Sequence, residues 1–135
     1  MTTNLNKTLE QLDKEDWKES AHDITGLIKK VHLLRKKPLK HFTTEDLRLI
    51  IGQSFCLDYL IPIAIDRLKE NILAEGDLYE GDLLHSILGS DINYWTNHKD
   101  QWQTVKQLYA DSRHIFDSNN TYRKIRKSYE QFENI

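Results

Sequence analysis

Apolar side chains recur along most of the chain at the three- and four-residue spacing of a helical face. The first clear stripe consists of Ile24, Leu27, Ile28, Val31 and Leu34. Asp23 precedes this stripe as a candidate N-cap, and Pro38 follows as a stop signal. A weaker stripe near the N-terminus consists of Leu5, Leu9 and Leu12. No segment has the two-residue alternation of a strand, so the pattern predicts an all-α protein.

The middle of the chain is predicted to form three further helices. Thr43 is a candidate N-cap for a helix that ends at Gly52. A longer helix is expected over residues 55–71, and because it is apolar on nearly every side, it should be the buried central element. Pro62 should kink this helix or lie in its first turn. A short helix over residues 82–88 should follow.

The C-terminal third is predicted to contain two helices. Asp91 is a candidate cap for one long helix that reaches Phe116. Its apolar stripe includes Trp95 and Trp102, which we assign to the core and not to a ligand platform. After a polar break, the last stripe consists of Tyr122, Ile125, Tyr129 and Phe132. Altogether, we expect a single compact domain of about six or seven helices spanning residues 1–135.

Charge is distributed unevenly, although the net charge of the whole chain is only −2. Residues 52–100 carry nine acidic and three basic side chains, whereas residues 24–51 carry two acidic and seven basic ones. A field of one sign attracts partners of the opposite sign. The acidic middle of the chain is therefore a candidate interaction surface.

Signals of a membrane or secreted protein are missing from the sequence. The longest apolar run, residues 60–65, contains a proline and is far shorter than the roughly 20 residues of a membrane span. Residues 1–4 have neither the basic nor the apolar region of a signal peptide. The single cysteine, Cys56, has no second cysteine with which to form an internal disulfide. We therefore expect a cytoplasmic protein with no membrane association.

Motifs for catalysis or cofactor binding are also missing. The sequence contains no GxxxxGK[ST], GxGxxG, HExxH, CxxC or GxSxG motif. No two of its six histidines are three or four residues apart, the spacing that would place two metal ligands on one helical face. Cys56 lies in an apolar stretch, which favours a structural thiol over a nucleophile. We expect no enzyme activity, no metal and no cofactor.

Two pairs of carboxylates surround a loop bounded by glycines: Glu75 with Asp77, and Glu80 with Asp82. General acid–base catalysis by such pairs would require a pocket and shifted pKa values. A solvated loop followed by a helix cap explains them equally well.

Two sequence blocks resemble those of one protein family. Residues 34–53, LRKKPLKHFTTEDLRLIIGQ, are similar to a block with the pattern LRKKPL-x-x-FT-x-EDLR that ends in IGQ. Residues 59–62, YLIP, and 75–84, EGDLYEGDLL, follow in the same order as a proline-containing helix and EGDFYPGDLL. The family is that of the helical CdiI-type immunity proteins of bacterial contact-dependent growth inhibition (CDI) systems. The resemblance covers about residues 24–95 and departs from the pattern at Leu78 and Glu80, where Phe and Pro are expected.

The resemblance implies a function that depends on binding. Immunity proteins of this kind lie in the cytoplasm and bind the C-terminal toxin domain of a CdiA effector, typically a nuclease, which protects the cell that makes them. A nuclease cleft attracts phosphate and tends to be basic. An acidic face on the inhibitor would then speed association and add specificity. The toxin-binding residues that we expect are Glu70, Glu75, Asp77, Glu80 and Asp82.

Other interpretations of the same residues stay open. The acidic block would instead hold the fold together if its glycines and aspartates served as turns and caps, with Tyr79 and Leu84 in the core. A helical nucleic-acid-binding regulator would use the basic residues of segment 35–40, and its binding would weaken steeply with salt. A small metal-dependent hydrolase would use His and Asp side chains from different helices.

Overall fold

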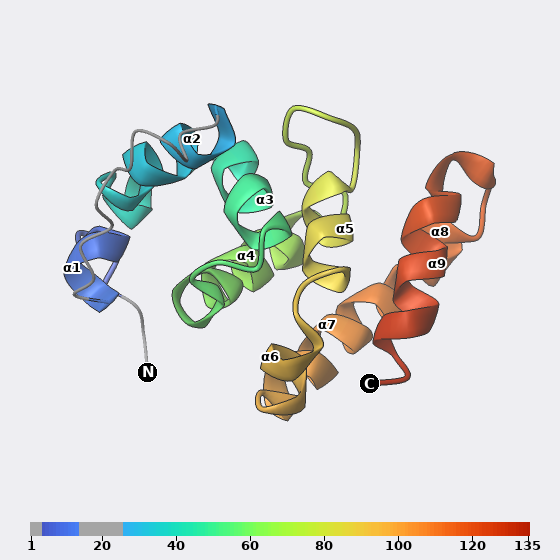
Figure 1. Cartoon of the computed structure of the whole chain (residues 1–135). Helices are drawn as coiled ribbons and strands as arrows, with labels where there is room; N and C mark the ends of the chain where they lie inside the picture. Colours follow the sequence, from blue (N-terminus) through green and yellow to red (C-terminus); the bar gives the residue numbers. More distant parts are fainter. Residues whose placement is uncertain (1–3, 14–25) are drawn as a thin grey trace.

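The computed structural model describes residues 4–13 and 26–135, and its regular elements are all helices (Figure 1). This confirms the predicted all-α fold. The α-helices are α1 (Leu9–Asp13), α2 (Gly26–Arg35), α3 (Thr44–Gly52), α4 (Leu57–Glu70), α5 (Asp82–Leu88), α6 (Ile92–Thr96), α7 (Lys99–Asp111), α8 (Arg113–Phe116) and α9 (Arg123–Phe132). Short 3₁₀ turns, η1 (Leu39–His41) and η2 (Asn120–Tyr122), complete the described elements.

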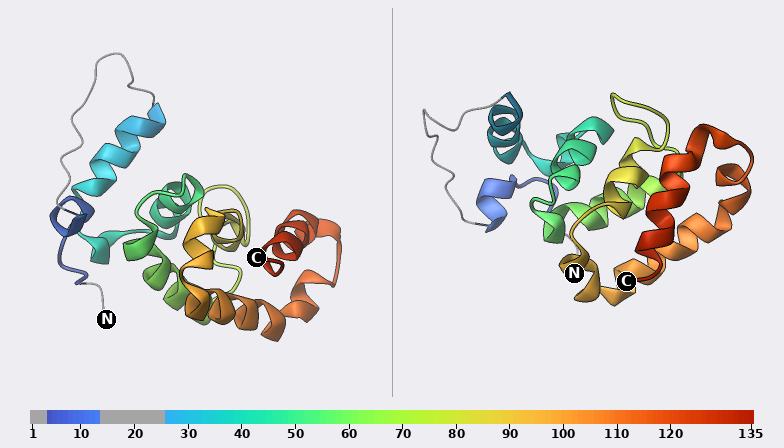
Figure 2. Two further views of the ribbon diagram at one scale, coloured as in Figure 1. Left: turned by 60° about the horizontal axis from the view of Figure 1, so that its bottom comes forward. Right: turned by 45° about the vertical axis from the view of Figure 1, so that its right-hand side comes forward.

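Successive helices follow one another across the molecule (Figures 1 and 2). α1 and α2 lie at one end, α3, α4 and α5 in the middle, and α8 and α9 at the other end. α5 packs against both α3 and α9, and α4 packs against α3 and α7. α5 therefore joins the middle of the molecule to its C-terminal end.

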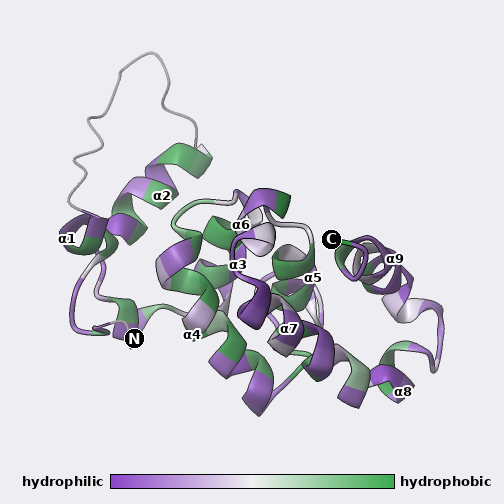
Figure 3. Ribbon diagram, turned by 90° about the horizontal axis from the view of Figure 1, so that it is seen from below, coloured by the Kyte–Doolittle hydropathy of each residue, from purple (hydrophilic) through white to green (hydrophobic). Residues whose placement is uncertain are grey.

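The core is built mainly from α4, α5 and the faces that surround them. α4 is one helix from Leu57 to Glu70 that continues through Pro62, which lies in its second turn. Its exposed face carries Asp58 and Asp66, so α4 is buried on one side and not on nearly every side as its composition suggested. Its buried residues are Leu57, Leu60, Ile61, Ala64, Ile65 and Leu68. The hydropathy colouring shows the contrast between the largely apolar α5 and the mostly polar α9 (Figure 3).

The long helix predicted between Asp91 and Phe116 is wrong, because this segment forms α6, α7 and α8. Polar side chains take backbone partners at the first break: Asn97 Nδ2 donates to the Asn93 carbonyl at 2.9 Å, and His98 Nδ1 lies 2.7 Å from the Tyr94 carbonyl. Such local bonds compete with helix continuation. The predicted stripe still packs inward, and Trp95 is completely buried.

Local signals set the other helix boundaries. Thr43 caps α3 in a capping box: its hydroxyl accepts from Asp46 N, and the Asp46 carboxylate accepts from Thr43 N. In α2, Val31 and Leu34 are buried as predicted, whereas Leu27 is more than a third exposed. The predicted cap Asp23 and the stripe residue Ile24 lie outside the described residues.

Candidate functional site: an acidic loop between α4 and α5

Residues 75–80, with the sequence EGDLYE, form a loop that projects from the molecule between α4 and α5 (Figure 1). We call this segment the acidic loop. Every residue of the acidic loop except Gly76 is exposed. The loop lacks regular secondary structure, so its conformation depends on contacts made by other residues.

A single buried carboxylate organises the backbone of the acidic loop. Asp82, in the first turn of α5, is only 1% exposed. Its Oδ1 accepts a hydrogen bond from Gly76 N at 2.6 Å, and its Oδ2 accepts from Leu78 N at 3.0 Å and Tyr79 N at 3.3 Å. Hydrogen bonds to an ionised acceptor are stronger than neutral ones. Asp82 therefore fixes the loop from inside.

A second carboxylate holds the loop from α3. Glu45 Oε1 accepts a hydrogen bond from Asp77 N at 2.9 Å. Arg48 pairs with both oxygens of Glu45 at 2.5 Å, and its Nε lies 3.9 Å from Asp82 Oδ2. The hydrogen bond from Arg48 is the main reason that the pKa of Glu45 lies below its usual value of 4.5. The positive charge of Arg48 thus offsets the negative charges of both carboxylates that hold the loop.

The two glycines at this site allow the close contacts. A Cβ at Gly76 would lie 2.6 Å from Glu45 Oε1 and 3.2 Å from Asp82 Oδ2, so a side chain there would collide with both anchors. Gly81 has φ of +85°, and a Cβ there would lie 2.7 Å from Ile125 Cδ1 of α9. Glycine at these two positions therefore allows the loop to approach α3, α5 and α9 without displacing their side chains.

The Tyr79 side chain lies against α5. Its hydroxyl is hydrogen-bonded to His85 Nδ1, and a hollow of about 230 Å³ beside the pair is lined by residues that include Arg48 and Leu78. Burial, and then the nearby charge of Lys124 on α9, lowers the pKa of His85 below 6.5. The Nδ1 atom of a neutral imidazole can accept a hydrogen bond that the Tyr79 hydroxyl donates.

The structure brings three of the five expected toxin-binding residues together. Glu75, Asp77 and Glu80 are exposed on the acidic loop. Asp82 is buried beneath it, where its carboxylate serves the loop backbone and has no free surface. Glu70 is exposed but lines a separate groove of about 510 Å³ between η1, α4 and α7, to which no residue of the acidic loop contributes.

The alternative in which this block supports the fold fits some of its residues. Leu84 is buried, as that interpretation requires, whereas Asp82 supports the loop backbone and does not cap α5. Tyr79, in contrast, is 40% exposed and does not lie in the core. The block therefore combines a buried support with an exposed loop.

Sequence reasoning missed Leu78, Glu45 and Arg48 as parts of this site. Leu78, in the acidic loop, is 61% exposed. The three-residue spacing of Glu45 and Arg48 is typical of an ion pair on one helix. Nothing in the sequence indicated that this pair would meet a loop about thirty residues further along.

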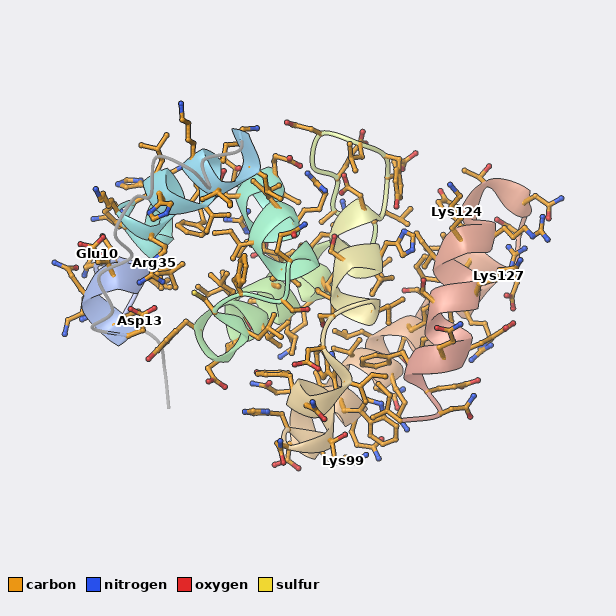
Figure 4. All side chains as sticks on the ribbon, viewed as in Figure 1. Glu10, Asp13, Arg35, Lys99, Lys124 and Lys127 are labelled. Carbon is orange, nitrogen blue, oxygen red and sulfur yellow. The ribbon has the colours of Figure 1, made fainter. Side chains whose placement is uncertain are left out.

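The basic segment 35–40 is divided between the interior and the surface. Arg35 is 1% exposed, and its two terminal nitrogens pair with the Asp13 carboxylate at 2.6 and 2.9 Å (Figure 4). Lys37 forms an ion pair with Asp46 at 2.7 Å. Lys36 and Lys40 are exposed. Two of the four cations expected to contact nucleic acid are thus paired with carboxylates of this chain.

Clustered metal-ligating side chains, a reactive cysteine or a long apolar helix in the described part of the chain would indicate other types of site. No three His, Cys, Asp or Glu side chains of this part lie together as metal ligands. Cys56 is partly buried and receives a hydrogen bond from Arg35 at 3.5 Å. No helix within residues 4–13 and 26–135 combines the length and apolar character that crossing a membrane requires.

The fold and this site define the class: a small all-helical domain whose acidic loop is held in place by the buried carboxylate of Asp82 and the partly buried carboxylate of Glu45. The family model of CDI immunity proteins matches residues 11–105. The chain belongs to the family of CDI immunity proteins, which implies that its partner is a toxin protein. The matched region includes the acidic loop with Glu45, Arg48 and Asp82, and it ends within α7. Searches of curated proteins and of solved structures found no match.

Proposed function

We propose that this protein neutralises the CdiA C-terminal toxin domain of its own CDI system by binding it in the cytoplasm, without turning over a substrate. The observation that carries the proposal is the acidic loop, which presents Glu75, Asp77 and Glu80 on a backbone fixed by Asp82 and Glu45. Residues 52–100, which include the loop, have a net charge of −6.

Physical reasons connect this loop to a basic toxin surface. A nuclease binds phosphate, so the region of its cleft is positively charged. Acidic side chains on the inhibitor accelerate the encounter with such a surface and disfavour wrong partners. The loop is already ordered by its hydrogen bonds, so little conformational entropy is lost when the complex forms.

Association kinetics provide the test. We expect the double variant Glu75→Lys/Glu80→Lys to bind the toxin domain with an association rate lower by about 10-fold or more at low salt. The difference should shrink as salt screens the charges. Surface plasmon resonance with the CdiA C-terminal domain encoded beside this protein would measure both rates.

A matched control makes the same change in net charge at two exposed carboxylates outside the acidic loop. These are Asp100, in the first turn of α7, and Glu133, which follows α9. Figure 1 shows the C-terminus on the side of the molecule away from the acidic loop. The variant Asp100→Lys/Glu133→Lys should retain most of the wild-type association rate. A wild-type protein that forms no complex with the toxin domain at micromolar concentration would overturn the proposal.

The chemistry of the toxin is tested separately. The purified toxin domain should degrade RNA or DNA, and one equivalent of this protein should stop the degradation. Inhibition by the loop variant Glu75→Lys/Glu80→Lys should require more protein. A toxin domain without nuclease activity would remove the nuclease part of the proposal and leave the binding part intact.

A further inference from the structure

Two large apolar residues of the acidic loop, Leu78 and Tyr79, are exposed. Their side chains are 61% and 40% exposed. Exposed apolar residues are common on protein surfaces and by themselves indicate little. Here, however, both backbone N–H groups are hydrogen-bonded to the buried carboxylate of Asp82. The protein therefore holds the main chain that carries these two exposed side chains in a defined position.

Acidic side chains flank this apolar pair in the sequence, and Arg48 lies on the α3 side of the hollow beside Tyr79. Asp77 precedes Leu78 and Glu80 follows Tyr79, and both carboxylates are exposed. An apolar centre within a charged rim is the usual arrangement of a protein–protein interface. Binding energy in such interfaces is concentrated in a few central residues.

We propose that Leu78 and Tyr79 form the apolar anchor of the toxin interface and enter an apolar depression that basic groups border on the toxin domain. This inference rests on the proposed function and adds the residues that determine how long the complex lasts. The acidic side chains beside the anchor give specificity, because they favour a partner with a basic surface. The anchor then slows dissociation, because its apolar surface leaves water only in the docked complex.

The ties on the loop make Leu78 and Tyr79 suitable anchors. Three hydrogen bonds from the loop backbone to Asp82, and one to Glu45, fix the main chain on which they lie. The bond between the Tyr79 hydroxyl and His85 also restricts the tyrosine ring. An anchor that is ordered before binding loses less entropy than a mobile one.

The test compares Leu78→Ala with a matched apolar substitution elsewhere. Ile92, at the start of α6, is 62% exposed, almost the same fraction as Leu78. We expect Leu78→Ala to raise the dissociation rate of the toxin complex by about 10-fold or more and to change the association rate by less than about 2-fold. Ile92→Ala should leave both rates unchanged.

Further variants separate the anchor from other effects. Leu78→Phe, which introduces the aromatic residue expected at this position, should preserve slow dissociation. Thermal unfolding of Leu78→Ala should match that of the wild type, since the side chain is mostly exposed.

Several outcomes would overturn the inference. A wild-type dissociation rate for Leu78→Ala, in a complex that still responds to the charge variants, would overturn the anchor alone. Failure of the wild type to bind would instead remove the proposed function. Sedimentation that finds a wild-type dimer and a Leu78→Ala monomer would identify a second copy of this chain as the occupant, against the inference.

Discussion

At the scale of single residues, the site depends on one carboxylate that never reaches the surface. Asp82 accepts three backbone hydrogen bonds and lies near Arg48, which makes the acidic loop an extension of α5. Asp77 and Glu80 lie close to Asp82 in the sequence and are also acidic, but their side chains are exposed whereas Asp82 is buried. Burial is what makes Asp82 a support for the loop while Asp77 and Glu80 remain available at the surface. Whether a residue here is buried depends on contacts with α3, which the local sequence does not specify.

Asp82→Asn should destabilise the protein by roughly 2–3 kcal/mol, because an amide offers one acceptor oxygen where the carboxylate offers two, and its NH₂ would face other donors. Urea denaturation would measure the loss. Asp77→Asn is the matched control, because the Asp77 side chain is exposed and only its backbone N–H is tied to Glu45. Equal stability losses in the two variants would contradict the structural role of Asp82.

His85 gives the loop a dependence on pH. Burial and the charge of Lys124 lower its pKa below the ordinary 6.5, so the unfolded chain takes up a proton at a higher pH than the folded protein does. The contribution of His85 to stability is therefore complete above about pH 6.5 and is lost as the pH falls through the lowered folded value. A protonated Nδ1 also cannot accept the Tyr79 hydroxyl proton.

We expect the free energy of unfolding to decline as the pH falls below about 6.5, and toxin binding to weaken with it. In His85→Gln, part of this decline should disappear, because the titrating group is gone. Urea denaturation at several pH values would provide the comparison. An identical pH dependence in the variant and the wild type would exclude His85 as its source.

At the scale of elements, local signals predicted helices well and contacts between helices poorly. The cap at Thr43 and the end of α5 before Gly89 follow from short sequence patterns, and the structure has both. The sequence did not predict the break at His98, because the apolar spacing continues across it. In the structure, the side chains of Asn97 and His98 contact backbone carbonyl groups there. The sequence correctly grouped Glu75, Asp77 and Glu80 only because these three residues are close together in the chain.

The partners that the sequence did not reveal come from distant segments. Glu45 reaches a loop residue 32 positions away, and Ile125 of α9 closes over Gly81. α9 lies beyond residue 105, where the family match ends, yet it packs against α5. The C-terminal helix therefore supports the base of the acidic loop.

Gly81→Ala should disturb this junction between α5, α9 and the loop. The new Cβ would occupy a left-handed backbone position and meet Ile125 Cδ1 at 2.7 Å, so we expect a stability loss of about 1–3 kcal/mol. Gly26→Ala is the control: among the described residues, no atom lies within 4 Å of its added Cβ, and alanine favours helix. Thermal unfolding should separate the variants, and a Gly81→Ala protein as stable as Gly26→Ala would contradict the packing role.

At the scale of the whole molecule, a small net charge hides an uneven distribution. Residues 52–100 are strongly acidic, whereas residues 101–135 have a net charge of +2. Lys124 and Lys127 are exposed on α9, and Lys124 lies near enough to His85 to lower its pKa (Figure 4). A basic toxin that docked on the acidic loop, as proposed, would therefore also meet the positive charge of Lys124 beside it.

Removing this positive charge should help association if the acidic loop alone meets a basic toxin. We expect Lys124→Gln/Lys127→Gln to raise the association rate about 2- to 3-fold at low salt, with the gain lost when the Debye length falls to a few ångströms near 1 M salt. Stopped-flow association across a salt series would measure it. Slower association would contradict this expectation, because it would mean that α9 itself contacts acidic groups of the toxin. The interface would then extend from the acidic loop onto the C-terminal helix, into the part of the chain that lies beyond the family match.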